Sequence, residues 1–223
     1  MPEKTVAPRK LPIMKLVVVG VVLLGVAVMV LRGFDVRGLI DRGMMVIREA
    51  GPAVFFGAMA ILPAFGAPMM AFTIPAGEAF AGRLGLGVVV AISLAAIAVN
   101  LALSYWVARY ALRPLIAGLV KRYGYSVPRV TPENALSVLL VVRLTPGPPY
   151  PLQCYLLGIA EAPFRLYMIV SWLALLPWVL GAIFLGRGLL NGNFRIAAMG
   201  AGVLVLAIVA VQWVRRKYAR REK

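Results

Sequence analysis

The chain has 223 residues, 62% of them hydrophobic, which is more apolar sequence than a soluble domain of this size can bury. The formal charge of +16 would indicate a nucleic-acid partner in a soluble protein, but here basic residues mostly flank apolar segments, so topology and anionic lipid explain them better. The lack of histidine and the single cysteine, Cys154, exclude His-ligated zinc, Ser-His triads and intramolecular disulfides, and no cofactor is implied.

The first apolar run, 16–31, has the outline of a signal peptide, with Lys15 before it and Arg32 directly after it. No polar, small-residue cleavage region follows, so we interpret it as an uncleaved transmembrane helix. Its helical rise of about 24 Å falls short of a full span. Snorkelling of the two flanking basic side chains makes up the difference.

Four uncharged segments can cross a bilayer, at 16–31, 84–108, 166–186 and 196–214. Two amphipathic helices are also predicted, over 36–48 and over 112–123, because apolar residues recur there at helical spacing. Each comes before one of the proline-interrupted stretches at 50–77 and 134–160. Both helices are predicted to lie along the membrane interface. The alternative is an ordinary solvated helix packed on the membrane domain.

Two further apolar stretches contain too many helix breakers to be straight spans. Residues 50–77 carry four prolines and four glycines, and residues 134–160 are interrupted by the segment RLTPGPPYP, from Arg143 to Pro151. Proline removes a helical hydrogen bond, so neither stretch forms one continuous helix. Both are predicted to be re-entrant hairpins, which enter and leave the membrane on one face.

The order of interfacial helix, hairpin and spanning helix occurs twice. The 27-residue separation of Gly82 and Arg109 nearly equals the 29-residue separation of Gly158 and Arg187, which indicates an internal repeat. Since each unit crosses the membrane once, the repeats are inverted, as in many transporters. The prediction is an all-α integral membrane protein with a single membrane domain: an N-terminal helix (1–33), repeat 1 (34–109), repeat 2 (110–188), and a C-terminal helix with a basic tail (189–223).

The basic residues give an independent prediction of the topology. Four crossings with two re-entrant hairpins put both termini on one side, and Lys and Arg then divide sixteen to seven, with Arg143 inside the second hairpin. The richer side is cytoplasmic by the positive-inside rule. We therefore predict a multi-pass protein of the cell membrane, plasma or bacterial inner, with both termini in the cytoplasm.

Arg143 is the most informative single residue, because an arginine at membrane depth costs roughly 2.5–3.5 kcal/mol on insertion scales. Its planar guanidinium, with backbone amides freed around Pro146 and Gly147, would hold a phosphate group. One alternative is a structural ion pair with Glu78 or Glu161. Others are an arginine that caps hairpin carbonyls, or a tightly packed turn without substrate access.

Glu78 follows the first hairpin and is the fourth predicted substrate-binding residue. A partly desolvated carboxylate there would titrate and couple transport to protons, or would pair with Arg143. A solvated glutamate beside Arg83 is the alternative. Arg109 and Arg187, at equivalent repeat positions, are predicted to be interface anchors.

The segments RLTPGPPYPLQCYLLG and PFRLYMIVSWLALLPWVLGAIFLGR resemble the DedA/VTT-domain superfamily, also called SNARE-associated Golgi proteins, and most closely its TVP-like branch. IPAGEAFAGRLG and SYWVARY agree with the family more loosely. The resemblance implies transport or scrambling of an anionic lipid, a phospholipid or polyprenyl phosphate, in some members coupled to protons. Pro151 and Cys154 replace asparagines that are usual in the TVP-like motif. The DedA branch carries an additional acidic residue within its first hairpin, whereas here Glu78 stands alone.

Two alternatives to this non-enzymatic lipid transporter remain. One is a membrane enzyme acting on a polyprenyl or lipid phosphate, since inverted re-entrant hairpins also occur in polyprenyl-diphosphate phosphatases. Such an enzyme would need clustered carboxylates with a nucleophile or metal. No such catalytic set and no metal ligands are predicted from the eight acidic residues. The other alternative is a scaffold for partner proteins, which would move no lipid.

Overall fold

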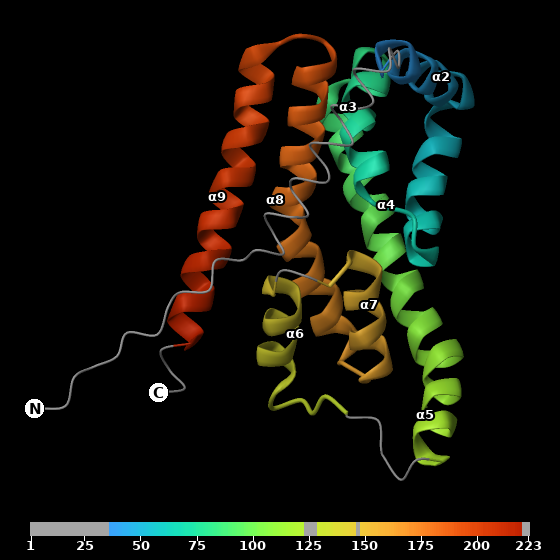
Figure 1. Ribbon diagram of the computed structural model, residues 1–223, viewed down its shortest axis with the longest axis vertical. Coiled ribbons are helices and arrows are strands. Elements are labelled where there is room, and N and C mark those ends of the chain that lie inside the picture. Colours follow the sequence, from blue (N-terminus) through green and yellow to red (C-terminus); the bar gives the residue numbers. More distant parts are fainter. Residues whose placement is uncertain (1–35, 123–128, 146–147, 220–223) are drawn as a thin grey trace, which may run out of the picture. The chain divides into compact units, whose positions relative to one another are not determined.

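The computed structural model describes residues 36–122, 129–145 and 148–219. The predicted helix at 16–31, both termini, and Pro146 and Gly147 lie outside these residues. Every regular element within them is helical, which confirms the all-α prediction (Figure 1). The chain divides into two compact units, 1–46 and 47–223. Of the first unit, the described part is the beginning of one helix, and the rest of the fold lies in the second.

Helix α2 (Val36–Ile61) joins the two units and is bent where the sequence predicts an interruption. Gly51 has φ 78° and ψ 166°, a backbone conformation that glycine adopts without steric cost. Pro52 then starts a new helical segment, where its missing N–H is not needed. The predicted amphipathic helix over 36–48 therefore corresponds to the part of α2 before the bend.

The segment after the bend forms the first hairpin, residues 52–84. A short 3-10 helix, η1 (Leu62–Phe65), ends at Gly66, whose φ of 103° reverses the chain, and α3 (Met70–Leu84) returns. The hairpin predicted at 50–77 is therefore helical along both arms, and its second arm extends beyond the predicted end, to Leu84. α3 continues through Pro75 to Leu84, although the missing N–H of Pro75 costs the helix one hydrogen bond.

Helix α4 (Leu86–Trp106) passes through a π-helix, η2 (Val107–Leu112), directly into α5 (Arg113–Arg122). The helix predicted over 112–123 is therefore present as α5, continuous with the span predicted at 84–108, and its place along the membrane interface stays a prediction. Pro114 cannot donate to the carbonyl four residues before it, and its ring crowds that turn. A wide π-turn accommodates the proline without ending the helix.

The second hairpin, residues 135–159, consists of α6 (Ala135–Leu144) and α7 (Tyr150–Ile159). α6 ends at Thr145, which is extended with φ −79° and ψ 118°. A residue before proline avoids the helical region, and Pro146 follows Thr145. The break predicted from the proline-rich segment is thus confirmed.

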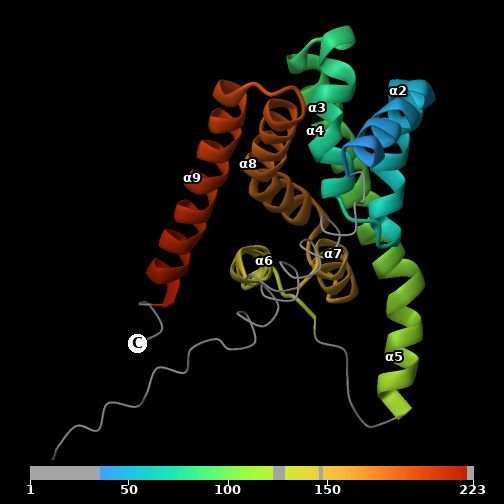
Figure 2. The same cartoon turned by 45° about the horizontal axis from the view of Figure 1, so that its top comes forward.

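Two long helices complete the chain, α8 (Phe164–Leu190) and α9 (Phe194–Ala219), which lie side by side (Figures 1 and 2). They confirm the helices predicted at 166–186 and 196–214. Among the described residues, four helices are long and apolar enough to cross a membrane: Gly38–Phe65, Leu86–Leu119, Phe164–Leu190 and Phe194–Val214. The protein is therefore a helical membrane protein.

Each hairpin packs on a long helix from the other half of the chain. α3 lies against α8, and α7 lies against α4 (Figure 2). Glycines permit these close approaches: a Cβ on Gly186 would overlap the backbone of Ile74 in α3, and a Cβ on Gly158 would lie 2.9 Å from the carbonyl oxygen of Tyr105 in α4. Small residues play this role between membrane helices, where backbones must approach closely.

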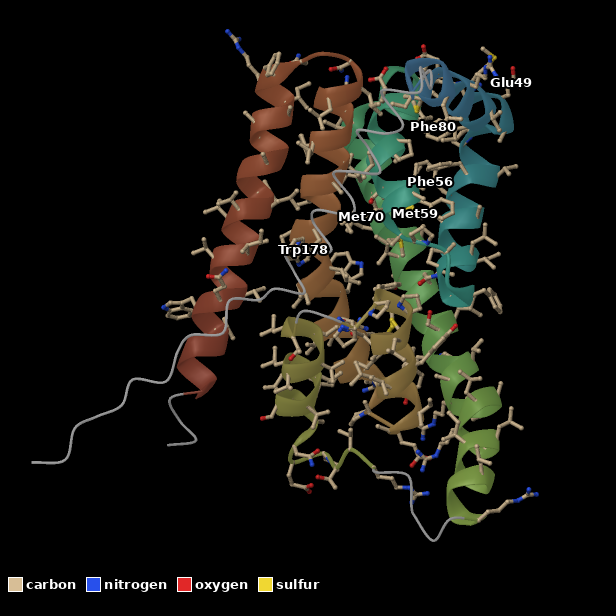
Figure 3. The ribbon with its side chains drawn as sticks, in the orientation of Figure 1. Glu49, Phe56, Met59, Met70, Phe80 and Trp178 are labelled. Carbon is tan, nitrogen blue, oxygen red and sulfur yellow. The ribbon has the colours of Figure 1, made fainter. Side chains whose placement is uncertain are left out.

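Aromatic packing joins the two arms of the first hairpin. Phe56 before the turn faces Phe80 after it, with ring centroids 5.5 Å apart, and Met59 is fully buried beside them (Figure 3). Phe55 adds a second ring 5.2 Å from Phe80. These side chains belong to one hydrophobic core that the first hairpin shares with α4, α7 and α8.

Candidate functional site

Arg143 lies next to the end of α6, and its side chain reaches α7 and α8. Its Nε donates to Ser171 Oγ at 2.9 Å, Nη1 to Gln153 Oε1 at 3.4 Å, and Nη2 to Cys154 Sγ at 3.4 Å. Gln153 is itself held by a bond from its Nε2 to the carbonyl of Pro148, at 3.1 Å. The guanidinium is thus fixed between the second hairpin and α8.

Two aromatic rings complete the surroundings of this cation. The guanidinium carbon lies 5.9 Å from the ring centre of Tyr150 and 5.5 Å from that of Tyr167, which is fully buried. At these distances the negative faces of the rings attract the cation. Ser171 and Cys154 are also fully buried, so water does not screen this side of the arginine.

No carboxylate within the described residues forms an ion pair with Arg143. Glu78 pairs instead with Arg48, at 3.1 Å, and Glu161 pairs with Arg113 and Arg129, at 3.1 and 3.0 Å. The alternative in which Arg143 is neutralised by Glu78 or Glu161 is therefore wrong. Each of these glutamates lies nearer to another arginine.

The Arg143 guanidinium keeps donors for a ligand. A guanidinium has five N–H groups, and three are engaged by described residues, on Ser171, Gln153 and Cys154. All three partners are neutral, so the positive charge is not cancelled. A planar cation with spare N–H groups, held rigid in a weakly screened environment, is suited to an oxyanion such as phosphate.

Asn100 connects the Arg143 surroundings to the first hairpin. It is fully buried in α4, its Nδ2 donates to the carbonyl of Ala60 at 3.0 Å, and its Oδ1 accepts from the Tyr150 hydroxyl at 2.9 Å. The Tyr155 hydroxyl also donates to the carbonyl of Ala64, in the turn of the first hairpin. The two hairpins therefore meet beside α4, and Tyr150 contacts both Asn100 and the arginine.

Replacing Asn100 with alanine should destabilise the protein, because it leaves the Ala60 carbonyl and the Tyr150 hydroxyl without their partner. We expect the free energy of unfolding to fall by about 1–3 kcal/mol, measured by thermal or denaturant unfolding in detergent. Ser104→Ala is the matched control, since this hydroxyl is equally buried in α4 but has no partner among the described residues. It should leave stability unchanged or raise it. Equal losses in both variants would show that the amide bonds contribute nothing specific.

Ion pairs hold the end of the second hairpin to α5. Glu161 has φ 56° and accepts from Arg113, which also donates to the carbonyl of Ile159 and is only 13% exposed. Arg109 donates to the hydroxyl of Tyr105, which in turn donates to the carbonyl of Ala162, at 2.7 Å. These arginines therefore join η2 and α5 to the exit of the second hairpin.

The structure separates Glu78 from Arg143. Glu78 lies in α3 and lines a pocket of about 410 Å³ together with Arg48 and Arg187. Arg83 is exposed and lines no part of this pocket.

Before α6, a hydrogen bond with the side chain of Thr131 lowers the pKa of Glu133, which therefore stays ionised at neutral pH. The predicted substrate-binding residues Pro146 and Gly147 lie outside the described residues.

The neighbours Ser171, Gln153, Tyr150 and Tyr167 of Arg143 were not predicted, nor was Asn100, which binds Tyr150. A signal existed for the last of these. Asn100 is the only amide side chain in the uncharged run 84–108, and an amide in lipid needs a hydrogen-bond partner. The other residues are common types in a polar-aromatic segment, and nothing in their spacing points to the arginine.

The fold and this site define a membrane protein of packed helices in which two hairpins meet beside a partly buried arginine. The family model described as the VTT domain matches residues 67–188, from the turn of the first hairpin to the last turn of α8. This is more than half of the chain, and the chain therefore belongs to the VTT-domain family, also known as the DedA/SNARE-associated Golgi protein family. The family is often linked to lipid transport in membranes.

No curated protein and no solved structure matches the chain. The superfamily predicted from the second-half motif is confirmed, and the TVP-like branch stays a prediction. Within the part of the chain that the structure describes, no three residues of the types histidine, cysteine, aspartate and glutamate lie together as a metal-binding group would require.

Proposed function

We propose that the protein moves an anionic lipid across the membrane, with the lipid phosphate at Arg143 and its hydrocarbon tails in the bilayer. The observation that carries this proposal is the unneutralised guanidinium of Arg143, whose described partners are all neutral, at the place where the hairpins meet. A phospholipid and a polyprenyl phosphate both present the required phosphate. Family membership supports lipid transport as the class of activity.

We further propose that the two halves are inverted repeats with re-entrant hairpins. Helix packing supports this, since the hairpin of each half lies against the long helix of the other half: α3 packs on α8, and α7 packs on α4. Backbone conformation supports it too: Gly85 has φ 83° and Glu161 has φ 56°, and each comes three residues after a glycine, Gly82 and Gly158. Both positions thus combine a positive φ with the passage from a hairpin to a long helix.

This topology predicts that single cysteines introduced at Arg37 and Arg122 label from opposite sides of the membrane, with Arg122 on the cytoplasmic side. A cysteine at Arg195 should label from the same side as Arg37, and serves as an independent marker of that face. Cys154 is fully buried, so it should contribute no background to labelling by an impermeant reagent. Labelling of positions 37 and 122 from one side would contradict the inverted repeats.

Lipid movement by the purified protein tests the proposed function. In proteoliposomes, headgroup-labelled phosphatidyl lipid or polyprenyl phosphate should become accessible to an impermeant quencher faster than in empty vesicles. The lipid should remain chemically unchanged. Release of inorganic phosphate in the presence of Mg²⁺ or Ca²⁺ would favour the membrane enzyme instead. Unchanged sidedness without phosphate release would favour the scaffold.

A further inference from the structure

A second basic site lies between α3 and α8, in the pocket of about 410 Å³. Arg48 and Arg187 line it together with one acidic residue, Glu78. The carboxylate of Glu78 is engaged by Arg48, with 3.1 Å between Nη2 and Oε1, whereas Arg187 forms no ion pair with any described residue. The charged side chains of the pocket therefore sum to one positive charge.

This pocket is distinct from the Arg143 site. Ser171, which binds Arg143, and Arg187 both belong to α8, and Arg187 follows Ser171 by 16 positions, which corresponds to about 24 Å along a helix axis. Ser171 lies near the beginning of α8, whereas Arg187 lies in its last turn. A ligand in the pocket would thus occupy the end of α8, more than half the helix length away from Arg143.

The pocket is lined by hydrogen-bond donors and has free space. Asn191 caps α8 and lines the pocket, and its Oδ1 accepts from the backbone of Asn193 at 3.0 Å, which leaves its amide N–H groups for a ligand. A Cβ on Gly82 would meet no atom within 4 Å, so this side of the pocket is open. A volume of 410 Å³ is within the usual range of ligand pockets and exceeds what a lone phosphate fills.

We propose that this pocket is a second headgroup site, which binds the phosphate of an anionic lipid through Arg187, with Asn191 and Arg48 as further donors. The inference rests on the proposed function, because the same lipid phosphate would occupy both sites. It adds a binding step at the α8 C-terminal end, where the headgroup is held before or after it contacts Arg143. The group recognised is a phosphate monoester or diester, and the lipid rather than free phosphate supplies it.

Ligand protection of a cysteine tests the site without measuring transport. Gly82→Cys places a thiol in the pocket without a steric clash, and Gly87→Cys places one at the start of α4, outside the pocket and equally free of neighbours. In detergent, dioctanoyl phosphatidic acid should slow alkylation of Gly82→Cys about tenfold and leave Gly87→Cys unchanged. Dioctanoylglycerol, which lacks the phosphate, should protect neither. Equal protection by this neutral lipid would overturn the proposal.

Charge variants in the Gly82→Cys background identify the binding groups. Arg187→Gln should raise the phosphatidic acid concentration needed for half-protection at least tenfold, Arg187→Lys by a smaller factor, and the exposed control Arg83→Gln not at all. Unfolding temperatures that match the parent show that these variants remain folded. Unchanged protection in Arg187→Gln would overturn the assignment. Protection by inorganic phosphate at the same concentration would overturn the lipid as the ligand.

The Arg143→Gln variant separates this inference from the proposed function. Protection of Gly82→Cys should persist in Arg143→Gln, because the pocket lies about 24 Å away along α8. Loss of protection in Arg143→Gln would show that the pocket and Arg143 form a single binding site, which would overturn the second site. If the protein moves no lipid but phosphatidic acid still protects through Arg187, the proposed function fails while the binding site stands.

Discussion

Arg143→Ala is expected to slow lipid movement in proteoliposomes about 30-fold or more, because the lipid phosphate would lose its cationic partner and the loss of one member of a buried charge pair costs roughly 2–5 kcal/mol. The protein should nevertheless remain folded. Ser171, Gln153 and Cys154 are neutral, so the substitution strands no charge. The measurement compares quencher accessibility of labelled lipid with the unfolding temperature of the same preparation.

Two further variants separate the guanidinium from charge alone. Arg143→Lys keeps the charge but lacks the planar pair of donors, so it should restore little of the lost rate. Arg165→Ala removes an equal charge from the exposed start of α8 and should leave transport within about twofold of the parent. Full activity in Arg143→Lys would show that transport does not need the planar pair of guanidinium donors. Loss of the fold in Arg143→Ala would make the arginine structural.

Gly186→Ala should lower the stability of the protein strongly. Its Cβ would overlap the carbonyl oxygen of Ile74, which belongs to the backbone of α3 and cannot rotate away. The first hairpin would have to shift from α8, and overpacking of this kind costs roughly 1–3 kcal/mol or more. Thermal unfolding in detergent should therefore show a lower transition temperature, and the displaced hairpin should reduce lipid movement as well.

Gly202→Ala is the matched control for Gly186→Ala. Gly202 is also inside a long helix, α9, but a Cβ there would meet nothing within 4 Å. Since alanine is the better helix former, this variant should be as stable as the parent or more stable by up to about 1 kcal/mol. A similar loss in both variants would show that α3 and α8 do not need the close approach.

The long helices and the second hairpin were predictable because local signals decide them. An uncharged run of sufficient length gives α8 and α9, and the prolines after Arg143 end α6. The passage from α4 into α5 was not predictable in this way. Pro114 suggests a helix boundary, but the chain absorbs it in a π-turn, and packing of η2 against α7 accompanies that choice.

The candidate site was predictable only in its central residue. Arg143 stands out because it is a charge within an apolar hairpin, which signals a site from sequence alone. Its partners come from elements brought together by folding, and Ser171 lies 28 residues away. The sequence also left Glu78 and Glu161 as equal candidates for an ion pair with Arg143, since nothing local indicates that Arg48 and Arg113 lie nearer to them.

The exchange of hairpins between the two halves has a consequence for synthesis of the chain. α7 follows α4 closely and can dock as soon as it emerges, but α3 needs the surface around Gly186, which follows Ile74 by 112 residues. At about 5–20 residues per second, a ribosome takes roughly 6–22 s to supply that surface. During this interval the first hairpin is inserted without its partner helix. A nascent chain stalled before α8 would therefore present α3 to the insertion machinery and to quality-control proteases.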